Sequence, residues 1–181
     1  MNEQFSIAGK VAVITGAGGV LGGSIAKCFM QQGAKVVAVD IRQKQLDKRV
    51  EELKTYGEDV IGIVGNVLDI SSLERLADDI VAKWGRIDIL LNIAGGNMPG
   101  ATLAPDQHFY DMDISCWEKV TNLNMNGTVY PSLVFSKVKM CIRDSLHAAG
   151  YVLHDFRRAL PDVLHRVGNG QHPYGCAGRC V

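Results

Sequence analysis

Short, unbroken runs of apolar residues alternate along the chain with segments in which apolar residues recur every three or four positions. Unbroken runs of this length are typical of strands in a parallel sheet, and the three-to-four spacing is typical of amphipathic helices. The runs predict strands at residues 10–15, 35–40, 60–65 and 87–95, with the first, second and fourth buried. The segments between them predict helices that pack on a sheet.

The predicted helices are marked by their apolar positions and by the residues at their ends. The first begins among the glycines that follow residue 15 and ends at Gly33. The third has the clearest periodicity, and Ser71 with Glu74 predicts a capping box at its start, while Gly85 is expected to end it. After a loop rich in proline and glycine, a long helix is predicted from about residue 115 to residue 137.

The repeated alternation of strand and helix decides the fold class. Strands that are joined by helices run parallel, and right-handed crossovers place helices on both faces of the sheet. The sequence therefore predicts an α/β fold with a doubly wound parallel sheet of the Rossmann type, incomplete at its C-terminal end. In such a sheet a ligand binds at the carboxyl ends of the strands, where the strand order reverses.

Composition and charge exclude several classes of protein. The chain has 181 residues, 47% of them hydrophobic and 21% charged, which is ordinary for one soluble globular domain. A formal net charge of zero gives no general attraction to nucleic acid or anionic lipid, and no apolar run is long enough to cross a membrane. There is no signal-peptide pattern, and the cysteines are odd in number without a C-x-x-C pair, so we expect a cytoplasmic protein.

The composition changes abruptly near residue 140. Every lysine lies at or before Lys139 and the last glutamate is Glu118, whereas later positively charged side chains are arginines. This predicts a dinucleotide-binding domain over residues 1–140 and a separate tail over 141–181. The favoured interpretation is a frame-shifted or foreign tail that starts near the sequence KMCIRDS. A metal-binding appendage is less favoured because its histidine and cysteine spacing fits no common zinc pattern, so no metal site is predicted, and a divergent helical cap is the third alternative.

The glycine-rich turn after the first predicted strand is the clearest candidate for a phosphate site. It reads TGAGGVLG from Thr15 to Gly22. Gly16 and Gly18 permit a tight turn and the close approach of a pyrophosphate, and Gly22 lets the helix pack closely on the strand. The head of the helix adds free N–H groups and the positive end of its dipole. A purely structural turn is the alternative, and its place in the first strand–helix–strand unit favours phosphate binding.

Asp40 ends the second predicted strand, at the position expected for a residue that binds ribose. A carboxylate there can accept hydrogen bonds from both hydroxyl groups of an adenine ribose, and it repels a 2′-phosphate. The sequence therefore predicts NAD as the cofactor. NADP is less favoured, although Arg42 lies nearby, and the alternative role for Asp40 is that of a helix cap.

These motifs resemble those of the short-chain dehydrogenase/reductase family over roughly residues 6–139. The family turn T-G-x-x-x-G-x-G is matched with Val20 in place of the middle glycine. The family's N-N-A-G after the fourth strand is matched by NIAG at residues 92–95, and N-x-x-G in its long helix by NMNG at residues 124–127. Asn66 stands where the family usually has an acidic residue that faces adenine.

The resemblance implies roles for individual residues. The turn would contact pyrophosphate, Asn66 and Val67 the adenine, and residues 92–95 the ribose next to nicotinamide. Asn124 would be the one assignable catalytic residue, holding a water relay, and a satisfied polar group in the core is the alternative. The candidate cofactor-binding residues are Gly16, Gly18, Gly19, Val20, Leu21, Gly22, Asp40, Asn66, Val67, Asn92, Ala94 and Gly95.

The resemblance also implies an NAD-dependent oxidoreductase that interconverts an alcohol and a ketone of a small molecule. Residues 94–107 resemble a loop of the fructuronate reductases (D-mannonate oxidoreductases) of this family, which implies a sugar-acid substrate. The parent enzyme is expected to be a homo-oligomer, as its relatives commonly are.

The catalytic serine and the Tyr-x-x-x-Lys of the family are missing from the sequence. No strand pattern ends in two serines, and no tyrosine has a lysine four residues later. We therefore expect weak or no dinucleotide binding and no turnover from the chain as written. The alternative function is that of a non-catalytic dinucleotide-binding or regulatory module.

Overall fold

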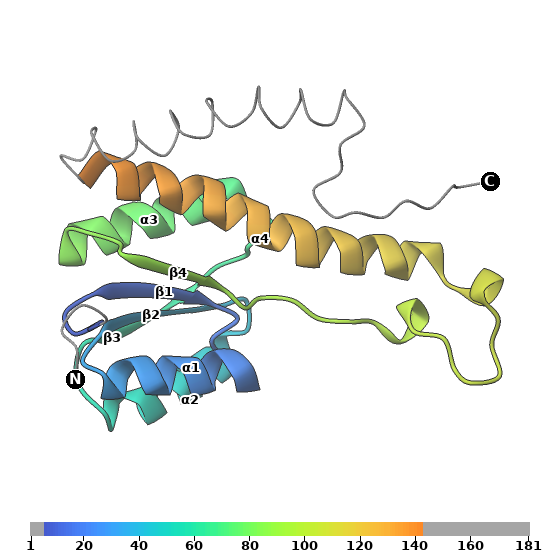
Figure 1. Cartoon of the computed structure of the whole chain (residues 1–181), viewed down its shortest axis with the longest axis horizontal. Coiled ribbons are helices and arrows are strands. Elements are labelled where there is room, and N and C mark those ends of the chain that lie inside the picture. Colours follow the sequence, from blue (N-terminus) through green and yellow to red (C-terminus); the bar gives the residue numbers. More distant parts are fainter. Residues whose placement is uncertain (1–5, 143–181) are drawn as a thin grey trace, which may run out of the picture. The chain divides into compact units, whose positions relative to one another are not determined.

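The computed structural model describes residues 6–142, and the predictions about the tail from residue 143 onward lie outside this part (Figure 1). Strands and helices alternate along the chain, and two short 3₁₀ helices lie in the loop before the last helix. The elements are β1 (Val11–Thr15), α1 (Val20–Gln31), β2 (Lys35–Asp40), α2 (Gln43–Lys54), β3 (Val60–Val64), α3 (Ile70–Trp84), β4 (Ile89–Asn92), η2 (Pro99–Ala101), η3 (Phe109–Asp111) and α4 (Ile114–Ile142).

The strands form one parallel sheet in the order β3-β2-β1-β4, with α1 and α2 on one face and α3 and α4 on the other (Figure 1). The predicted doubly wound α/β fold is confirmed. Because the chain passes from β3 at one edge to β4 on the far side of β1, the strand order reverses between β1 and β4. This reversal places a crevice at the carboxyl ends of these two strands.

Two hydrophobic cores cover the two faces of the sheet, and the alternation of side chains along β1 and β2 separates them. Val13 and Val39 lie in the core against α3 and α4, which contains Leu73 and Phe135. Ile14 lies in the opposite core, against α1 and α2. The two central strands are therefore fixed from both sides, and they hold the turns that follow them in place.

The edge strand β4 differs from its prediction. The apolar run at residues 87–95 predicts a long buried strand, but β4 covers only Ile89–Asn92 and is half-buried. After Asn92 the backbone leaves the ladder, because the N–H groups of Ile93 and Ala94 both donate to the hydroxyl oxygen of Thr15, at 3.1 Å each. Thr15 is fully buried at the end of β1, so it joins the two segments that follow β1 and β4.

The helix ends are partly as predicted. Gly33 and Gly85 follow their helices with φ of +77° and +72°, as expected for residues that end a helix in the left-handed conformation. The predicted capping box at Ser71 is wrong, because α3 begins at Ile70 and its cap is Asp69. The side chain of Asp69 accepts a hydrogen bond from Ser72 N at 3.1 Å, which satisfies a free N–H of the first turn.

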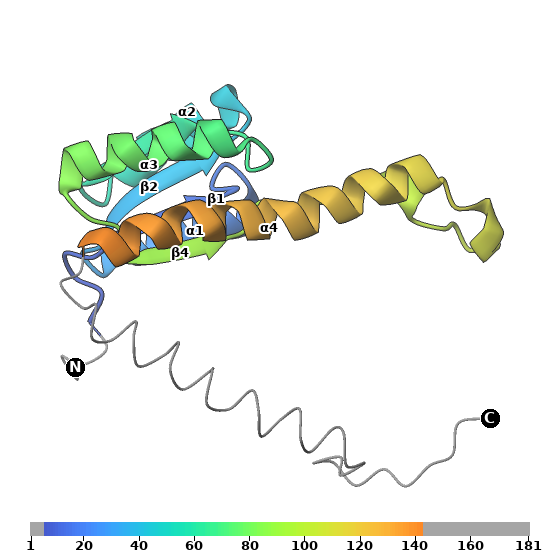
Figure 2. The same ribbon diagram turned by 90° about the horizontal axis from the view of Figure 1, so that it is seen from above.

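The long helix α4 extends further than its predicted range, and it continues through Pro131. In both views its first half projects past the sheet together with the loop that contains η2 and η3 (Figure 1 and Figure 2).

Hydrogen bonds from Ser115 and Cys116 to Asp113 at the start of α4 lower the pKa of the Asp113 carboxyl to about 2. Within the described residues no helix combines the length and apolar character needed to span a membrane, and the cytoplasmic location stays a prediction.

Candidate functional site

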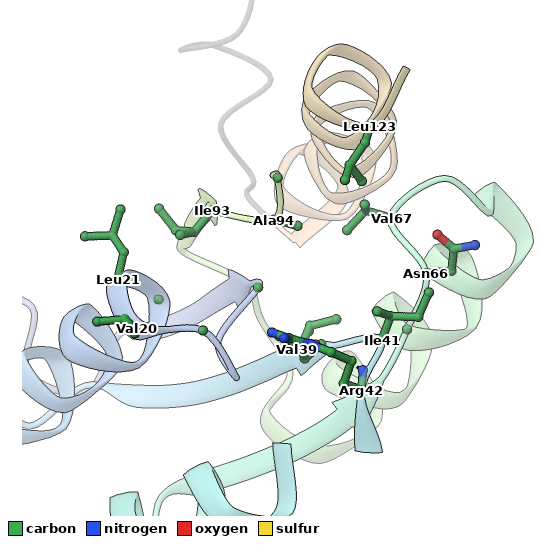
Figure 3. A pocket seen from close by; sticks show the side chains of 16 residues that line it. Val20, Leu21, Val39, Ile41, Arg42, Asn66, Val67, Ile93, Ala94 and Leu123 are labelled. Carbon is green, nitrogen blue, oxygen red and sulfur yellow. The ribbon is translucent and has the colours of Figure 1, made fainter. Parts of the chain in front are cut away.

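A cleft of about 390 Å³ lies at the carboxyl ends of the strands. Its walls come from the turn after β1, from the segments that follow β2, β3 and β4, and from Leu123 of α4 (Figure 3). Figure 3 shows Val20 and Leu21 of α1 on one side of it, and Val67 with Leu123 on another. The sequence predicted a ligand site at this place in the sheet.

The turn after β1 is shaped by two glycines that no other residue could replace without a shift of the backbone. Gly16 has a φ of +68°, and a Cβ on it would lie 2.8 Å from the backbone nitrogen of Ala94. A Cβ on Gly22 would overlap the carbonyl group of Gly16. The absence of both Cβ atoms lets the turn, the first turn of α1 and the end of β4 meet at one point. The sequence predicted that Gly22 lets the helix pack on the strand. Gly22 does serve close packing, but against Gly16 and Ala17 of the turn after β1.

Gly18 has a different part in the site from the one that the sequence suggests. A Cβ on Gly18 would lie 2.8 Å from Oδ2 of Asp40, and Gly18 N donates to that oxygen at 3.0 Å. Gly18 does not lie among the residues that line the cleft. Its missing side chain makes room for the Asp40 carboxylate.

The head of α1 opens into the cleft without a capping side chain. The N-cap is Gly19, and the first turn contains no acidic residue. The N–H groups of the first helical residues have no partner inside an α-helix, so the N–H groups of Val20, Leu21 and Gly22 are suited to an anion. The side chains of Val20 and Leu21 are 86% and 62% exposed, which is unusual for apolar residues of a first turn and provides apolar walls for a ligand.

Asp40 is a buried carboxylate at the wall of this cleft, 5% exposed. Besides Gly18 N, the Arg42 backbone N and side-chain Nε donate to it, at 3.0 and 3.1 Å. Burial raises the pKa of Asp40, but the hydrogen bonds and charge of Arg42 and the Gly18 N–H outweigh it, so the pKa lies below its usual value. The carboxylate is therefore charged at neutral pH. The alternative role as a helix cap is wrong, because the N-cap of α2 is Arg42.

The residues after β3 and β4 complete the walls. Asn66, Val67, Ala94 and Gly95 line the cleft, where the sequence placed adenine and the nicotinamide-side ribose. Asn92 does not line it, since its Nδ2 donates to Ser132 Oγ of α4 at 3.0 Å. Asn92 therefore connects β4 to α4 beneath the cleft.

Asn124 holds the loop that follows β4. Its Oδ1 accepts from Gly96 N at 3.1 Å, and its Nδ2 donates to Gly96 O at 2.8 Å. Asn124 is exposed, so the alternative of a polar group in the core is wrong. Gly95 permits this contact, because a Cβ there would lie 2.5 Å from Asn124 Oδ1. The predicted water relay at Asn124 is not tested by these contacts and stays a prediction.

Several lining residues were not among the predicted ones. Most lie within two positions of a predicted residue, as Ile41 and Arg42 do of Asp40. Leu123 comes from α4, and only its place next to Asn124 in the sequence could have indicated it. Within the described residues no cluster of three or more histidine, cysteine, aspartate or glutamate side chains could hold a metal ion.

Comparisons with known proteins agree with this geometry. A protein-family model described as short chain dehydrogenase matches residues 10–142. The uncharacterized oxidoreductase UxuB of Bacillus subtilis is 35% identical over 140 residues, which are 73% of this chain and 50% of UxuB. D-threitol dehydrogenase of Mycolicibacterium smegmatis is 33% identical over 125 residues, 69% of this chain and 45% of the relative.

A solved structure shows the same arrangement of elements. It is that of a candidate D-mannonate oxidoreductase from Haemophilus influenza with bound NAD, with a TM-score of 0.67 and 33% identity, and the match covers 74% of this chain and 51% of that one. The chain thus spans about half the length of the curated relatives and the solved structure that it matches.

Proposed function

Since this chain belongs to the short-chain dehydrogenase family, we propose that it forms the NAD-binding half of an oxidoreductase that interconverts a secondary alcohol and a ketone. The matched residues 10–142 include the glycine turn, Asp40 and the N-x-x-G of α4. When bound, the nicotinamide would accept or return the hydride of such a reaction. The sequence alone led us to expect weak or no binding from the chain as written. Because the cleft is formed entirely by described residues, we propose instead that this chain binds and orients the dinucleotide.

The observation that carries the proposal is a charged carboxylate beside an uncapped helix head in one cleft. The helix head attracts an anion, whereas Asp40 repels one. A simple phosphate ion can therefore bind at the helix head but cannot bind at Asp40. A nucleoside diphosphate satisfies both, because ribose hydroxyl groups that donate to Asp40 lie next to the phosphates that the helix attracts. The charge on Asp40 also disfavours the 2′-phosphate of NADP, whereas Arg42, which lines the same cleft and pairs with Asp40, acts in the opposite direction.

The position of each residue supports a role in the site. The N–H groups of Val20, Leu21 and Gly22 would hold the pyrophosphate, with Gly16 and Gly19 beside them, and Asn66 and Val67 would hold adenine. Ala94 and Gly95 would hold the ribose next to nicotinamide. Gly18 and Asn92 act through their neighbours, by accommodating Asp40 and by anchoring β4 to α4.

The proposal is tested by titrating the ¹⁵N-labelled 181-residue chain with NAD and NADP and following backbone amide shifts. NAD is expected to bind at least about tenfold more tightly than NADP, because like charges in contact cost affinity. The shifts are expected at the turn after β1 and at the segment around Asp40. Equal affinities would contradict the preference, and the absence of any shift would contradict dinucleotide binding.

For the substrate we propose a sugar acid, with D-mannonate and D-fructuronate as the alcohol and ketone pair. The resemblance of residues 94–107 to the fructuronate reductase loop supports this, as does the likeness to the candidate D-mannonate oxidoreductase of known structure. The substrate is a property of the whole protein. The assay therefore requires a full-length relative that retains this loop.

A non-catalytic module is the second candidate, favoured by the missing Tyr-x-x-x-Lys. We expect no alcohol oxidation by the purified chain with NAD, since proton transfer and oxyanion stabilisation need those side chains. Measurable turnover would contradict this expectation. The two candidates are separated by translating the encoding DNA beyond codon 139 in its other frames. A strand ending in two serines, followed by Tyr-x-x-x-Lys, favours the enzyme.

A further inference from the structure

Arg49 of α2 lies against the head of α1, behind the candidate phosphate site. Its Nη2 donates to the carbonyl oxygen of Gly19 at 3.3 Å, and its Nη1 donates to Glu52 Oε2 at 2.6 Å. The Arg49 side chain is only 19% exposed. A residue outside the cleft thus contacts the residue from which α1 begins.

Gly23 provides the space for this contact. A Cβ on Gly23 would overlap the guanidinium group of Arg49, so the arginine packs directly against the Cα of Gly23. Gly23 is buried in the second turn of α1, where glycine is less favourable than alanine for helix stability. The position of Arg49 accounts for a glycine that helix formation alone disfavours.

Two features of the placement of Arg49 are electrostatically unfavourable, although Glu52 pairs with its guanidinium group. A cation at the N-terminal end of a helix opposes the helix dipole. Its Nε is buried and has no hydrogen-bond partner among the described residues, which adds a desolvation cost. A negatively charged ligand at the head of α1 reverses this balance, because it is attracted by both the helix and the arginine.

The contact also reinforces the direction of an N–H group at the head of α1, which the hydrogen bond from Gly23 N to Gly19 O already favours. The Gly19 carbonyl oxygen accepts from Gly23 N at 3.0 Å as well as from Arg49. In a planar trans peptide the C=O and the following N–H point in opposite directions. Fixing the Gly19 carbonyl on the Arg49 side therefore turns the N–H of Val20 to the other side, and Val20 lines the cleft.

We propose that Arg49 is a positioning residue for the pyrophosphate of the dinucleotide. It holds the Gly19–Val20 peptide in the orientation that binds phosphate, and it adds positive potential from behind. The inference rests on the proposed function of the cleft. Arg49 itself does not touch the ligand, so it acts on the phosphates and leaves the binding of adenosine unchanged.

The test compares NAD and adenosine affinities of the 181-residue chain, measured from amide shifts, for Arg49→Met and for Lys48→Met. Lys48 is an exposed lysine on the same helix, and its loss removes the same charge without the contact to Gly19. Arg49→Met loses the charged hydrogen bond to Gly19, which acts on the ligand only indirectly. We therefore expect it to weaken NAD binding about fivefold and to leave adenosine binding unchanged. Lys48→Met is expected to leave both affinities unchanged.

Gly23→Ala separates positioning from stability. The added Cβ displaces the guanidinium group but retains its charge and favours the helix. We expect NAD affinity to fall, but by less than in Arg49→Met because the charge is retained, and we expect no lower Tm. The double variant should bind NAD no more weakly than Arg49→Met alone, because both changes remove one contact.

The outcomes distinguish the two proposals. If the wild-type chain shows no shifts with NAD, the proposed function fails and the role of Arg49 fails with it. If the wild type binds NAD and Arg49→Met binds it equally well, only the role of Arg49 is overturned. Equal losses for NAD and adenosine would show that Arg49 merely supports the fold. Full NAD affinity in Gly23→Ala would show that the contact of Arg49 with Gly19 does not position the phosphate site, and the proposed role would be overturned.

Discussion

Asp40→Asn is expected to lower the affinity of the chain for NAD by about tenfold to a hundredfold, the range that corresponds to the loss of a hydrogen bond to a charged group. The carboxylate accepts from both Gly18 N and Arg42 N, on its two oxygens. An asparagine retains the shape but places an NH₂ donor against one of these N–H donors. The variant therefore loses the charged acceptor for the ribose hydroxyl groups, and it also disturbs the hydrogen bonds that hold this side chain in place.

NADP provides the sensitive comparison for Asp40. Because the variant no longer carries the charge that repels a 2′-phosphate, its affinity for NADP should fall less than its affinity for NAD. The preference for NAD therefore narrows, and titrations of both nucleotides measure it. Since the pKa of Asp40 lies below its usual value, acidification from neutral pH to about pH 5 should not imitate the substitution.

Asp47→Asn is the matched control for the change of charge. Asp47 lies on the exposed side of α2, where its Oδ1 accepts from Gln43 Nε2. We expect its NAD affinity to equal that of the wild type. An Asp40→Asn chain with an unchanged ratio of NAD to NADP affinity would mean that Asp40 only supports the turn, and the ribose assignment would be wrong.

The sequence predicted the order and type of the strands and long helices because hydrophobic periodicity reports which face of each element is buried. It failed where a contact distant in the sequence decides a boundary. The apolar run after Asn92 continues as a strand pattern, but the Thr15 hydroxyl takes up the N–H groups of Ile93 and Ala94. At α3, Asp69 caps the helix two residues before the predicted cap, because the local pattern around Ser71 and Glu74 does not fix the residue at which the helix begins.

The same distinction applies to the site. The turn and Asp40 were predictable, because glycine spacing and an acid at the end of the second strand are local signals. The role of Gly18 was not, since it depends on how closely a carboxylate 22 residues away approaches it. The contact of Arg49 with Gly19 likewise joins α2 to the start of α1, and these two residues are 30 positions apart in the sequence. Such pairs are set by the packing of α1 and α2 on the sheet, which periodicity does not specify.

Gly16→Ala is expected to have the largest effect on the stability of the chain. Gly16 combines a left-handed φ of +68° with a close approach to the segment after β4, because a Cβ would lie 2.8 Å from Ala94 N and 2.9 Å from Ala94 Cα. The left-handed conformation costs about 1–2 kcal/mol for a residue with a Cβ, and overpacking against backbone atoms adds about 1–3 kcal/mol. We expect the free energy of unfolding, measured by urea denaturation, to fall by about 2–5 kcal/mol as their sum.

Gly85→Ala isolates the conformational part of this effect. Gly85 has a nearly identical φ of +72°, but a Cβ there would meet nothing within 4 Å. Its substitution should therefore cost only about 1–2 kcal/mol and leave NAD affinity unchanged, since Gly85 ends α3 away from the cleft. Gly16→Ala should also lose NAD binding, because relief of the contact must displace either the turn or the backbone of Ala94, and both form walls of the cleft. If the two variants lost the same stability, the close contact between Gly16 and the segment after β4 would contribute nothing to the effect of Gly16→Ala, and this explanation would be wrong.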